Sequence, residues 1–296
     1  MTAIAGVSAR SRSDRGGRFL VPLVAVMALT SIYPAVYSLI YSLFDWNWGQ
    51  RLNFVGLANY VDVLASDRFR TALVNTVVFT VSAVSVELLL GLGLAVAVNR
   101  VGRGGGFVRS LLLLPLMVSG IIVSVAWKIL LDPTVGLVGY GAEVLGFPRL
   151  GFLGDPGMAM GSIVLIDTWW QTAFVFIVLA AGLRALPAEP LEAAEVDGAS
   201  AWQRFRYVAL PLLRPVILIV MLFRTIDCMK VFAIIFGTTG GGPLTTTESV
   251  QVLAYRTAFK QLNMSVSMTM MVIFTVIVLG IVLAYQRLGA GRELTR

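Results

Sequence analysis

Histidine is absent from this chain of 296 residues, and cysteine occurs once, as Cys228. Without histidine the chain lacks the commonest general base and the commonest metal ligand, and one cysteine cannot form an intrachain disulfide. Charged residues make up only 13% of the sequence, against about 25% in a typical soluble domain. No phosphate-binding G-x-x-x-x-G-K-[ST], nucleophile elbow, metal-ligand cluster or base-reading motif occurs. The sequence therefore predicts no catalytic residue, no metal site, no cofactor and no nucleic-acid partner.

Hydrophobic residues are abundant, at 57% of the chain. Six apolar stretches have the roughly 20 residues that a helix needs to cross a bilayer. The first is longer than the usual apolar region of a signal peptide, about 7–15 residues, and no clear cleavage site follows it. We therefore expect an all-α integral membrane protein, surrounded by lipid, with six transmembrane helices: Phe19–Phe44, Thr71–Val98, Leu111–Leu131, Gly157–Leu183, Pro211–Phe236 and Met264–Tyr285.

The distribution of basic residues predicts the orientation of these spans. With the N-terminus in the cytoplasm, 14 of the 23 Lys and Arg residues lie on the inner side and seven on the outer side. Short cytoplasmic loops carry the excess of Lys and Arg, so both termini are expected inside. The chain then divides into a cytoplasmic tail at 1–18, a transmembrane domain at 19–287 and a second cytoplasmic tail at 288–296.

A charged segment, 187–215, interrupts the apolar chain on the predicted cytoplasmic side. Gly198 is expected to end a short helix, because glycine adopts the left-handed conformation that closes helices. Ser200 and Gln203 have capping-box spacing and predict the start of a second helix. Pro211 is expected to restart the chain as the fifth span.

This segment resembles the EAA loop of binding-protein-dependent ABC importer permeases. The family pattern is E-A-A-x-x-D-G-A, then F, then a β-branched residue, then L-P, and every position is filled. The resemblance implies a cytoplasmic coupling helix that docks on an ATPase. It assigns ATPase coupling to Glu192, Ala193, Ala194, Asp197, Gly198, Ala199, Phe205, Leu210 and Pro211.

Other motifs extend the resemblance over nearly the whole chain from about Phe19, and they are similar to the maltose/trehalose/polyol type of permease. They include Thr239-Gly240-Gly241-Gly242-Pro243 with Thr247-Glu248, and Phe54-x-Gly56-x-x-Asn59-Tyr60. One departure is Ala233, where members often carry Asp. The resemblance implies a bacterial inner-membrane subunit that forms half of a path for a sugar, oligosaccharide or polyol. Its implied partners are a second permease, a dimer of ATP-binding subunits and an extracytoplasmic solute-binding protein.

Ionisable residues inside the predicted spans are candidates for the path, because burying them in hydrocarbon is costly. Arg224, Asp227 and Lys230 are spaced i, i+3, i+6, which places them on one side of a helix. They either line the path and bind sugar hydroxyls or form a structural charge network between helices. Glu87 is expected to tie two helices together, with Gly91 and Gly93 allowing a close approach.

Asp167, Trp170 and Gln171 share one face of the fourth span by their i, i+3, i+4 spacing. An acid, an indole and an amide suit a sugar, which offers hydroxyls and C–H faces. We therefore predict that they bind substrate. The alternative is that Trp169 and Trp170 lie at the lipid interface.

Two other classes of function remain open. A permease for a non-sugar solute, such as glycerol phosphate, would share the same architecture. A secondary transporter would also be polytopic but would need no docking segment, and a membrane enzyme would need a catalytic cluster that is not found.

Overall fold

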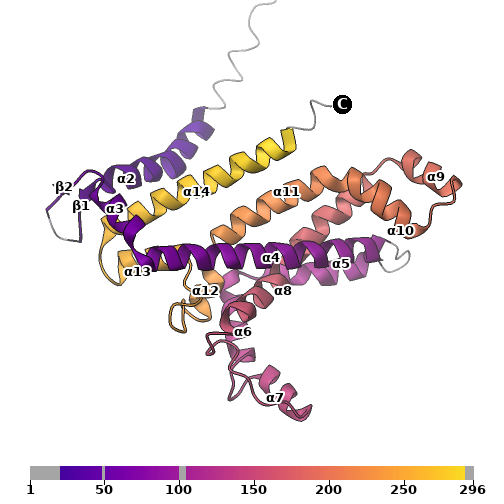
Figure 1. Cartoon of the computed structure of the whole chain (residues 1–296), viewed down its shortest axis with the longest axis horizontal. Coiled ribbons are helices and arrows are strands. Elements are labelled where there is room, and N and C mark those ends of the chain that lie inside the picture. Colours follow the sequence, from indigo (N-terminus) through magenta and orange to yellow (C-terminus); the bar gives the residue numbers. More distant parts are fainter. Residues whose placement is uncertain (1–20, 49–50, 100–104, 291–296) are drawn as a thin grey trace, which may run out of the picture.

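The computed structural model describes residues 21–48, 51–99 and 105–290. The predicted tail at 1–18 and most of the tail at 288–296 lie outside these ranges. The described chain is mostly helical, and its long helices run along the long axis of the molecule (Figure 1).

Within the described ranges, five helices are long and apolar enough to cross a membrane, or up to six if one bent pair forms a single span. Each of the five contains most of a predicted span, and the last runs beyond its predicted end to Ala290. The five are Val21–Tyr41 (with η1, Ala28–Ile32, and α2, Tyr33–Tyr41), α4 (Asp67–Asn99), α8 (Ala159–Arg184), Ala201–Met229 and α14 (Met264–Ala290).

The third predicted span is not one straight helix. α5 (Gly105–Leu113) and η2 (Leu114–Met117) end before α6 (Gly120–Leu130), and the two halves are bent by 94°. Pro115 cannot donate a helical hydrogen bond, and Val118 and Ser119 adopt extended backbone. As a result, α6 and the following α7 (Leu137–Val144) project sideways from the bundle (Figure 1).

The fifth span also differs from its prediction, at both ends. Pro211 does not restart a helix, because α10 (Ala201–Gln203), the π-helical η3 (Arg204–Ala209) and α11 (Leu210–Met229) form one continuous helix. A proline ring clashes with the carbonyl four residues earlier, and the wider π-turn beside Pro211 relieves that crowding. At the other end the helix stops at Met229, and a separate short helix, α12 (Ala233–Gly237), follows.

The first loop after the N-terminal span contains the only strands found in the described ranges. β1 (Phe44–Asp45) pairs antiparallel with β2 (Asn53–Phe54), and α3 (Ala58–Ala65) follows. Asn59 donates from its amide to the carbonyl oxygens of Ser42 and Phe44, at 2.9 and 2.8 Å. These bonds explain the asparagine in this sequence motif, because it fastens α3 to the end of the first span.

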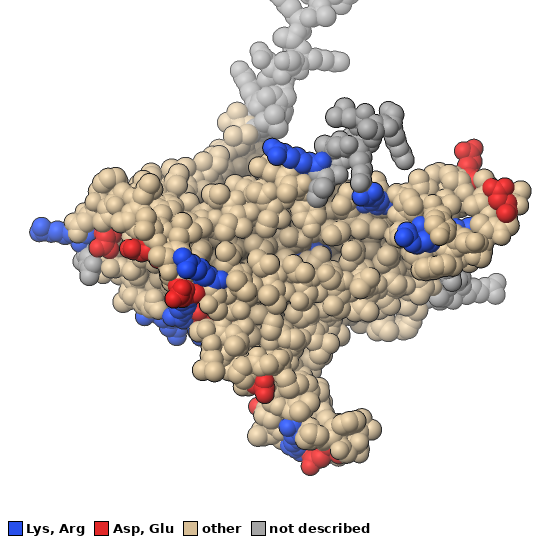
Figure 2. Space-filling view, in the orientation of Figure 1, with Lys and Arg blue, Asp and Glu red and all other residues tan. Residues whose placement is uncertain are grey.

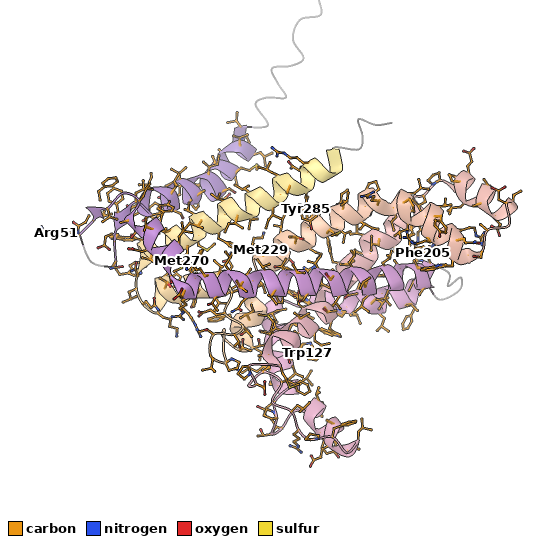
Figure 3. All side chains as sticks on the ribbon, in the orientation of Figure 1. Arg51, Trp127, Phe205, Met229, Met270 and Tyr285 are labelled. Atoms are coloured by element: carbon orange, nitrogen blue, oxygen red, sulfur yellow. The ribbon has the colours of Figure 1, made fainter. Side chains whose placement is uncertain are left out.

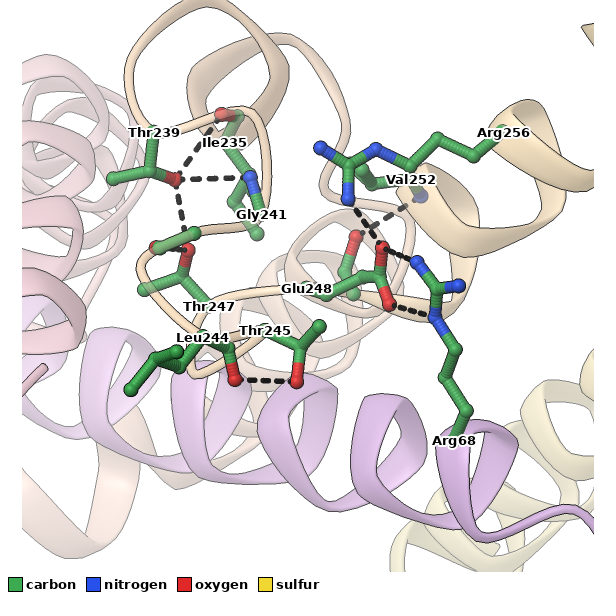
Figure 4. A network of polar contacts seen from close by, with 12 residues as sticks. Arg68, Ile235, Thr239, Gly241, Leu244, Thr245, Thr247, Glu248, Val252 and Arg256 are labelled. Atoms are coloured by element: carbon green, nitrogen blue, oxygen red, sulfur yellow. Dashed lines mark hydrogen bonds and ion pairs between the residues drawn. The ribbon is translucent and has the colours of Figure 1, made fainter. Parts of the chain in front are cut away.

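The loop that follows α12 is folded around one buried carboxylate (Figure 4). Glu248, 1% exposed, accepts two hydrogen bonds from Arg68 and one from Arg256, at 2.7–2.9 Å. Asn75 of α4 donates to the carbonyl oxygens of Thr245 and Glu248. The loop is therefore held to α4 before it continues into α13 (Val250–Phe259).

The core is centred on α4 and α8, which share the most extensive contact of any helix pair. At Gly91 an added Cβ would lie 2.5 Å from Cγ1 of Val175, so only glycine allows this approach. Gly93, in contrast, has nothing within 4 Å. The expected role in close packing is confirmed for Gly91 and wrong for Gly93.

The surface carries few charges along its middle. In the space-filling view most Lys, Arg, Asp and Glu side chains gather toward the ends of the long axis and on the projection that contains α7 (Figure 2). Large apolar side chains on the outer faces of the spans, such as Val81 and Leu89 of α4, are 60% and 72% exposed. This pattern is what a lipid environment requires.

Candidate functional site

A buried cluster of charged side chains joins three spans. Arg224 of α11, 2% exposed, donates through Nε and Nη2 to both carboxylate oxygens of Glu87 on α4, at 2.6 and 2.8 Å. Its Nη2 also donates to Oδ2 of Asp167 on α8, at 2.8 Å. The planar guanidinium can bind several acceptors at once, so one side chain ties α4, α8 and α11 together. The predicted role of Glu87 in joining helices is therefore consistent with these contacts.

Three side chains of this cluster, Glu87, Asp167 and Cys228, lie close enough together to hold a metal ion. Arg224 contacts all three, since its Nη2 also lies 3.1 Å from Sγ of Cys228. The guanidinium therefore occupies the position that a cation would take, and the donor set does not fit a metal ion as well.

The predicted stripe on α11 is brought together only in part. Asp227 forms an ion pair with Arg224, three residues before it on the same side of the helix, but 61% of the Asp227 side chain is exposed. Lys230 follows the end of the helix, with φ −88° and ψ 18°, and is exposed. Among the described residues it makes no ion pair, so the structure separates it from the cluster.

The predicted face of α8 is buried and contains more polar groups than expected. Gln171 is 8% exposed and makes no hydrogen bond within the described part of the chain. The hydroxyl oxygens of Thr168 and Thr172 are buried and likewise have no partner there. These three residues lie within about 100° of arc on the helix. Buried polar groups usually have hydrogen-bond partners, so this face, which we call the α8 polar face, has hydrogen-bonding capacity that the described chain does not use.

The two tryptophans of α8 point to different neighbours. Trp170 donates from Nε1 to the carbonyl oxygen of Val118, at 3.1 Å. Its ring also packs so closely on Gly120 that an added Cβ there would lie 2.7 Å from it. Trp170 thus supports the break between η2 and α6. Trp169 is 47% exposed and packs edge-on against Trp127.

The charged segment forms a short helical hairpin at one end of the long axis, near the label of Phe205 in Figure 3. α9 (Ala188–Val196) is followed by a turn in which Gly198 has φ +79°. Two backbone hydrogen bonds close this turn, from Gly198 N–H to the carbonyl of Glu195 and from Ala199 N–H to the carbonyl of Ala194. Ser200 and Gln203 form both bonds of the capping box. The left-handed glycine and the capping box are therefore confirmed.

Comparison with known proteins identifies the chain. A family model described as "Binding-protein-dependent transport system inner membrane component" matches residues 88–289. The chain belongs to this family. The matched range contains α8, the hairpin and the rest of the Ala201–Met229 helix, and therefore Asp167 and Arg224 of the buried cluster but not Glu87.

Similar proteins extend the likeness over nearly the whole chain. The trehalose/maltose transport system permease protein MalF of Thermococcus litoralis is 34% identical, covering 94% of each chain. The sn-glycerol-3-phosphate transport system permease protein UgpA of Agrobacterium fabrum is 33% identical, covering 88% of this chain and 90% of its own. A crystal structure of a bacterial alginate ABC transporter, in complex with an alginate pentasaccharide-bound periplasmic protein, is 22% identical with a TM-score of 0.84 over 96% of both chains. The last likeness shows the fold alone.

Three residues of the candidate site were not predicted from the sequence: Thr168, Thr172 and Val118. Thr168 and Thr172 carried a signal, since they are spaced i, i+4 beside Gln171 on an otherwise apolar helix. The carbonyl of Val118 carried none, because its exposure depends on the break in the third span.

Proposed function

We propose that this permease subunit carries a carbohydrate, meaning a sugar, oligosaccharide or polyol, and forms half of its path across the membrane. The observation that carries this proposal is the α8 polar face, where Thr168, Gln171 and Thr172 lie buried without partners. Hydroxyl and amide groups exchange hydrogen bonds with sugar hydroxyls, and a site built from them rejects molecules that lack those groups. Asp167, Trp170, Arg224, Asp227 and Lys230 complete the proposed substrate-binding set.

The charge of the buried cluster favours a neutral solute. Glu87, Asp167 and Asp227 surround the single guanidinium of Arg224. A path beside three carboxylates and one arginine gives no excess of positive charge to attract an anion. A non-sugar solute such as glycerol phosphate is the second candidate, and the likeness to UgpA is what favours it.

Coupling to ATP hydrolysis is proposed for the hairpin. α9 has no buried residue and contacts the rest of the chain mainly through η3. Val196 and Trp202 are 88% and 68% exposed, so the hairpin offers an apolar surface to a partner. This supports an EAA coupling loop that docks on one of two ATP-binding subunits. The proposed residues are Glu192, Ala193, Ala194, Asp197, Gly198, Ala199, Phe205, Leu210 and Pro211.

The other proposed partners are a second permease and an extracytoplasmic solute-binding protein. A solved transporter of the same fold was crystallised with its periplasmic protein. With six spans and both termini in the cytoplasm, the end of the molecule that carries α3 and the Glu248 loop faces outward. This end is therefore the one that a solute-binding protein would reach.

Transport itself tests the function. The chain, reconstituted in proteoliposomes with its ATP-binding and permease partners, should take up a carbohydrate only when ATP and the solute-binding protein are present. Uptake of glycerol phosphate with no uptake of any sugar or polyol would instead support the second candidate. Uptake that needs an ion gradient and no ATP would contradict both.

Trp170→Ala should lower carbohydrate uptake more than Trp169→Ala. Only Trp170 lies against Gly120 and the carbonyl of Val118, beside the α8 polar face, whereas Trp169 is half exposed. Initial uptake rates, normalised to the amount of assembled complex, measure the difference. The reverse order would show that the substrate passes on the other side of α8.

The proposed orientation predicts which single cysteines react from outside the cell. Val135 and Val196 are 76% and 88% exposed, at the α7 projection and the hairpin. In a Cys228→Ser background, Val135→Cys should react with a membrane-impermeant maleimide in intact cells. Val196→Cys should react only after the cells are opened. Labelling of Val196→Cys in intact cells would contradict the proposed orientation and place the hairpin outside the cell.

A further inference from the structure

A groove of about 310 Å³ opens beside the junction of η3 and α11. Its lining residues are Arg206, Leu210, Pro211, Arg214 and Ile217. All five belong to the Ala201–Met229 helix, where the hairpin meets the apolar span. We call it the junction groove.

The two arginines of the junction groove have no carboxylate partner. Arg206 and Arg214 are exposed, and within the described ranges neither forms an ion pair. Arg206 lies over the ring of Tyr207, with Cζ 6.0 Å from the ring centroid. Arg204, two residues before Arg206, is instead paired with Glu195. The helix thus keeps two guanidinium groups available at one opening, and guanidinium binds phosphate oxygens in a bidentate manner.

The rest of the groove is apolar and continues toward the middle of the span. Leu210, Pro211 and Ile217 line it, and Ile217 lies about 4–5 Å along the helix axis beyond Arg214. Next to it, Trp202 and Tyr207 are 68% and 72% exposed. Such aromatic side chains favour the boundary between headgroups and hydrocarbon. Leu210 and Pro211 lie between the two arginines along the helix, and Ile217 lies beyond them. An anion that fits this lining has a phosphate between Arg206 and Arg214 and an aliphatic chain that continues toward Ile217.

We propose that the junction groove binds an anionic phospholipid, with its headgroup phosphate at Arg206 and Arg214 and an acyl chain along Leu210 and Ile217. Basic pockets at the cytoplasmic membrane surface are typical of such sites. The inference rests on the proposed function only for the side of the membrane, which makes this the cytoplasmic leaflet. An acidic surface of an ATP-binding subunit is the competing occupant. Leu210 and Pro211 also belong to the proposed coupling set, but the lining includes no residue of α9 or of its turn and reaches into the apolar span as far as Ile217, which favours lipid.

Lipid retention by the purified complex tests the proposal without any transport assay. The full chain is isolated with its partners in mild detergent, and native mass spectrometry measures bound phosphatidylglycerol against added phosphatidylcholine. The unchanged protein should retain phosphatidylglycerol selectively. A basic residue near an anionic surface contributes about fivefold in affinity, so Arg206→Gln with Arg214→Gln should weaken retention by roughly 25-fold.

Two comparisons decide between the possible occupants. Arg184→Gln is the matched control, because Arg184 is an exposed arginine at the C-terminal end of α8, shortly before the hairpin, and does not line the junction groove. This variant should retain lipid normally. Inorganic phosphate at millimolar concentration should not displace the lipid, and displacement would make this a site for soluble phosphate.

Retention of phosphatidylglycerol by the double variant at the level of the unchanged protein would overturn the proposal. Reduced copurification of the ATP-binding subunit with unchanged lipid retention would assign the junction groove to that subunit. Failure of transport with normal lipid selectivity would count against the proposed function alone.

Discussion

Replacing Arg224 by methionine should remove most of the assembled protein from the membrane. Arg224 is 2% exposed, and its loss leaves the carboxylates of Glu87 and Asp167 buried without a countercharge. Removing one partner of a buried ion pair costs about 3–5 kcal/mol, a large share of the roughly 5–15 kcal/mol by which proteins are typically stable. We expect a large loss in the yield of monodisperse, detergent-solubilised complex, and a lower melting temperature for what remains.

Two further variants make this expectation specific. Asp227→Asn should leave the yield unchanged, because 61% of that side chain is exposed and Arg224 keeps two other carboxylates. Lower uptake at unchanged yield would then support Asp227 as a path residue. Adding Glu87→Gln and Asp167→Asn to Arg224→Met should restore part of the yield, since no buried charge is then left unpaired. A normal yield of Arg224→Met alone would show that the cluster does not hold the three helices together.

Gly198→Val should lower both solute-stimulated ATP hydrolysis and transport while the protein still reaches the membrane. Gly198 has φ +79° and nothing within 4 Å of an added Cβ, so the change acts through the backbone alone. The left-handed conformation costs a residue with a Cβ about 1–2 kcal/mol, which reduces the population of the closed turn roughly 5- to 30-fold. Solute-stimulated ATPase activity and uptake should both fall by a similar factor.

Gly198→Asn is the matched control for the backbone argument. Asparagine adopts the left-handed region more readily than other residues with a Cβ, so this variant should keep most of the coupled activity. If both variants are equally inactive, the position needs the absence of a side chain at a docking surface. If both are fully active, the turn has no part in coupling.

Local features of the fold were predictable because they depend on neighbouring residues. Apolar run length located most of the spans, and the capping box at Ser200 and Gln203 formed as its spacing predicted. The break in the third span was missed because apolar composition alone does not distinguish a straight helix from a bent one. Pro115 and Gly120 were the available signals, and Trp170 from another helix completes the bend.

The candidate site was only half predictable for the same reason. The pair Arg224–Asp227 follows from helical spacing, whereas the contacts of Arg224 with Glu87 and Asp167 join residues 137 and 57 positions apart. Which carboxylates meet a buried arginine is decided by how α4, α8 and α11 pack. Lys230 was assigned to the stripe on the assumption that the helix continued, and the helix stops one residue before it.

The unbroken helix from Ala201 to Met229 has a mechanical consequence. Arg224 lies 23 residues from its hairpin end, a distance of about 35 Å along the axis. The helix can therefore act as a rigid lever that pivots where Arg224 binds Glu87 of α4 and Asp167 of α8, with the hairpin at its far end. A tilt of about 10° around that pivot displaces the hairpin by roughly 6 Å. A small rotation at Arg224 thus accompanies a large displacement of the hairpin. The stiffness of the hydrogen bonds of Arg224 then determines how much of that movement is transmitted to α4 and α8.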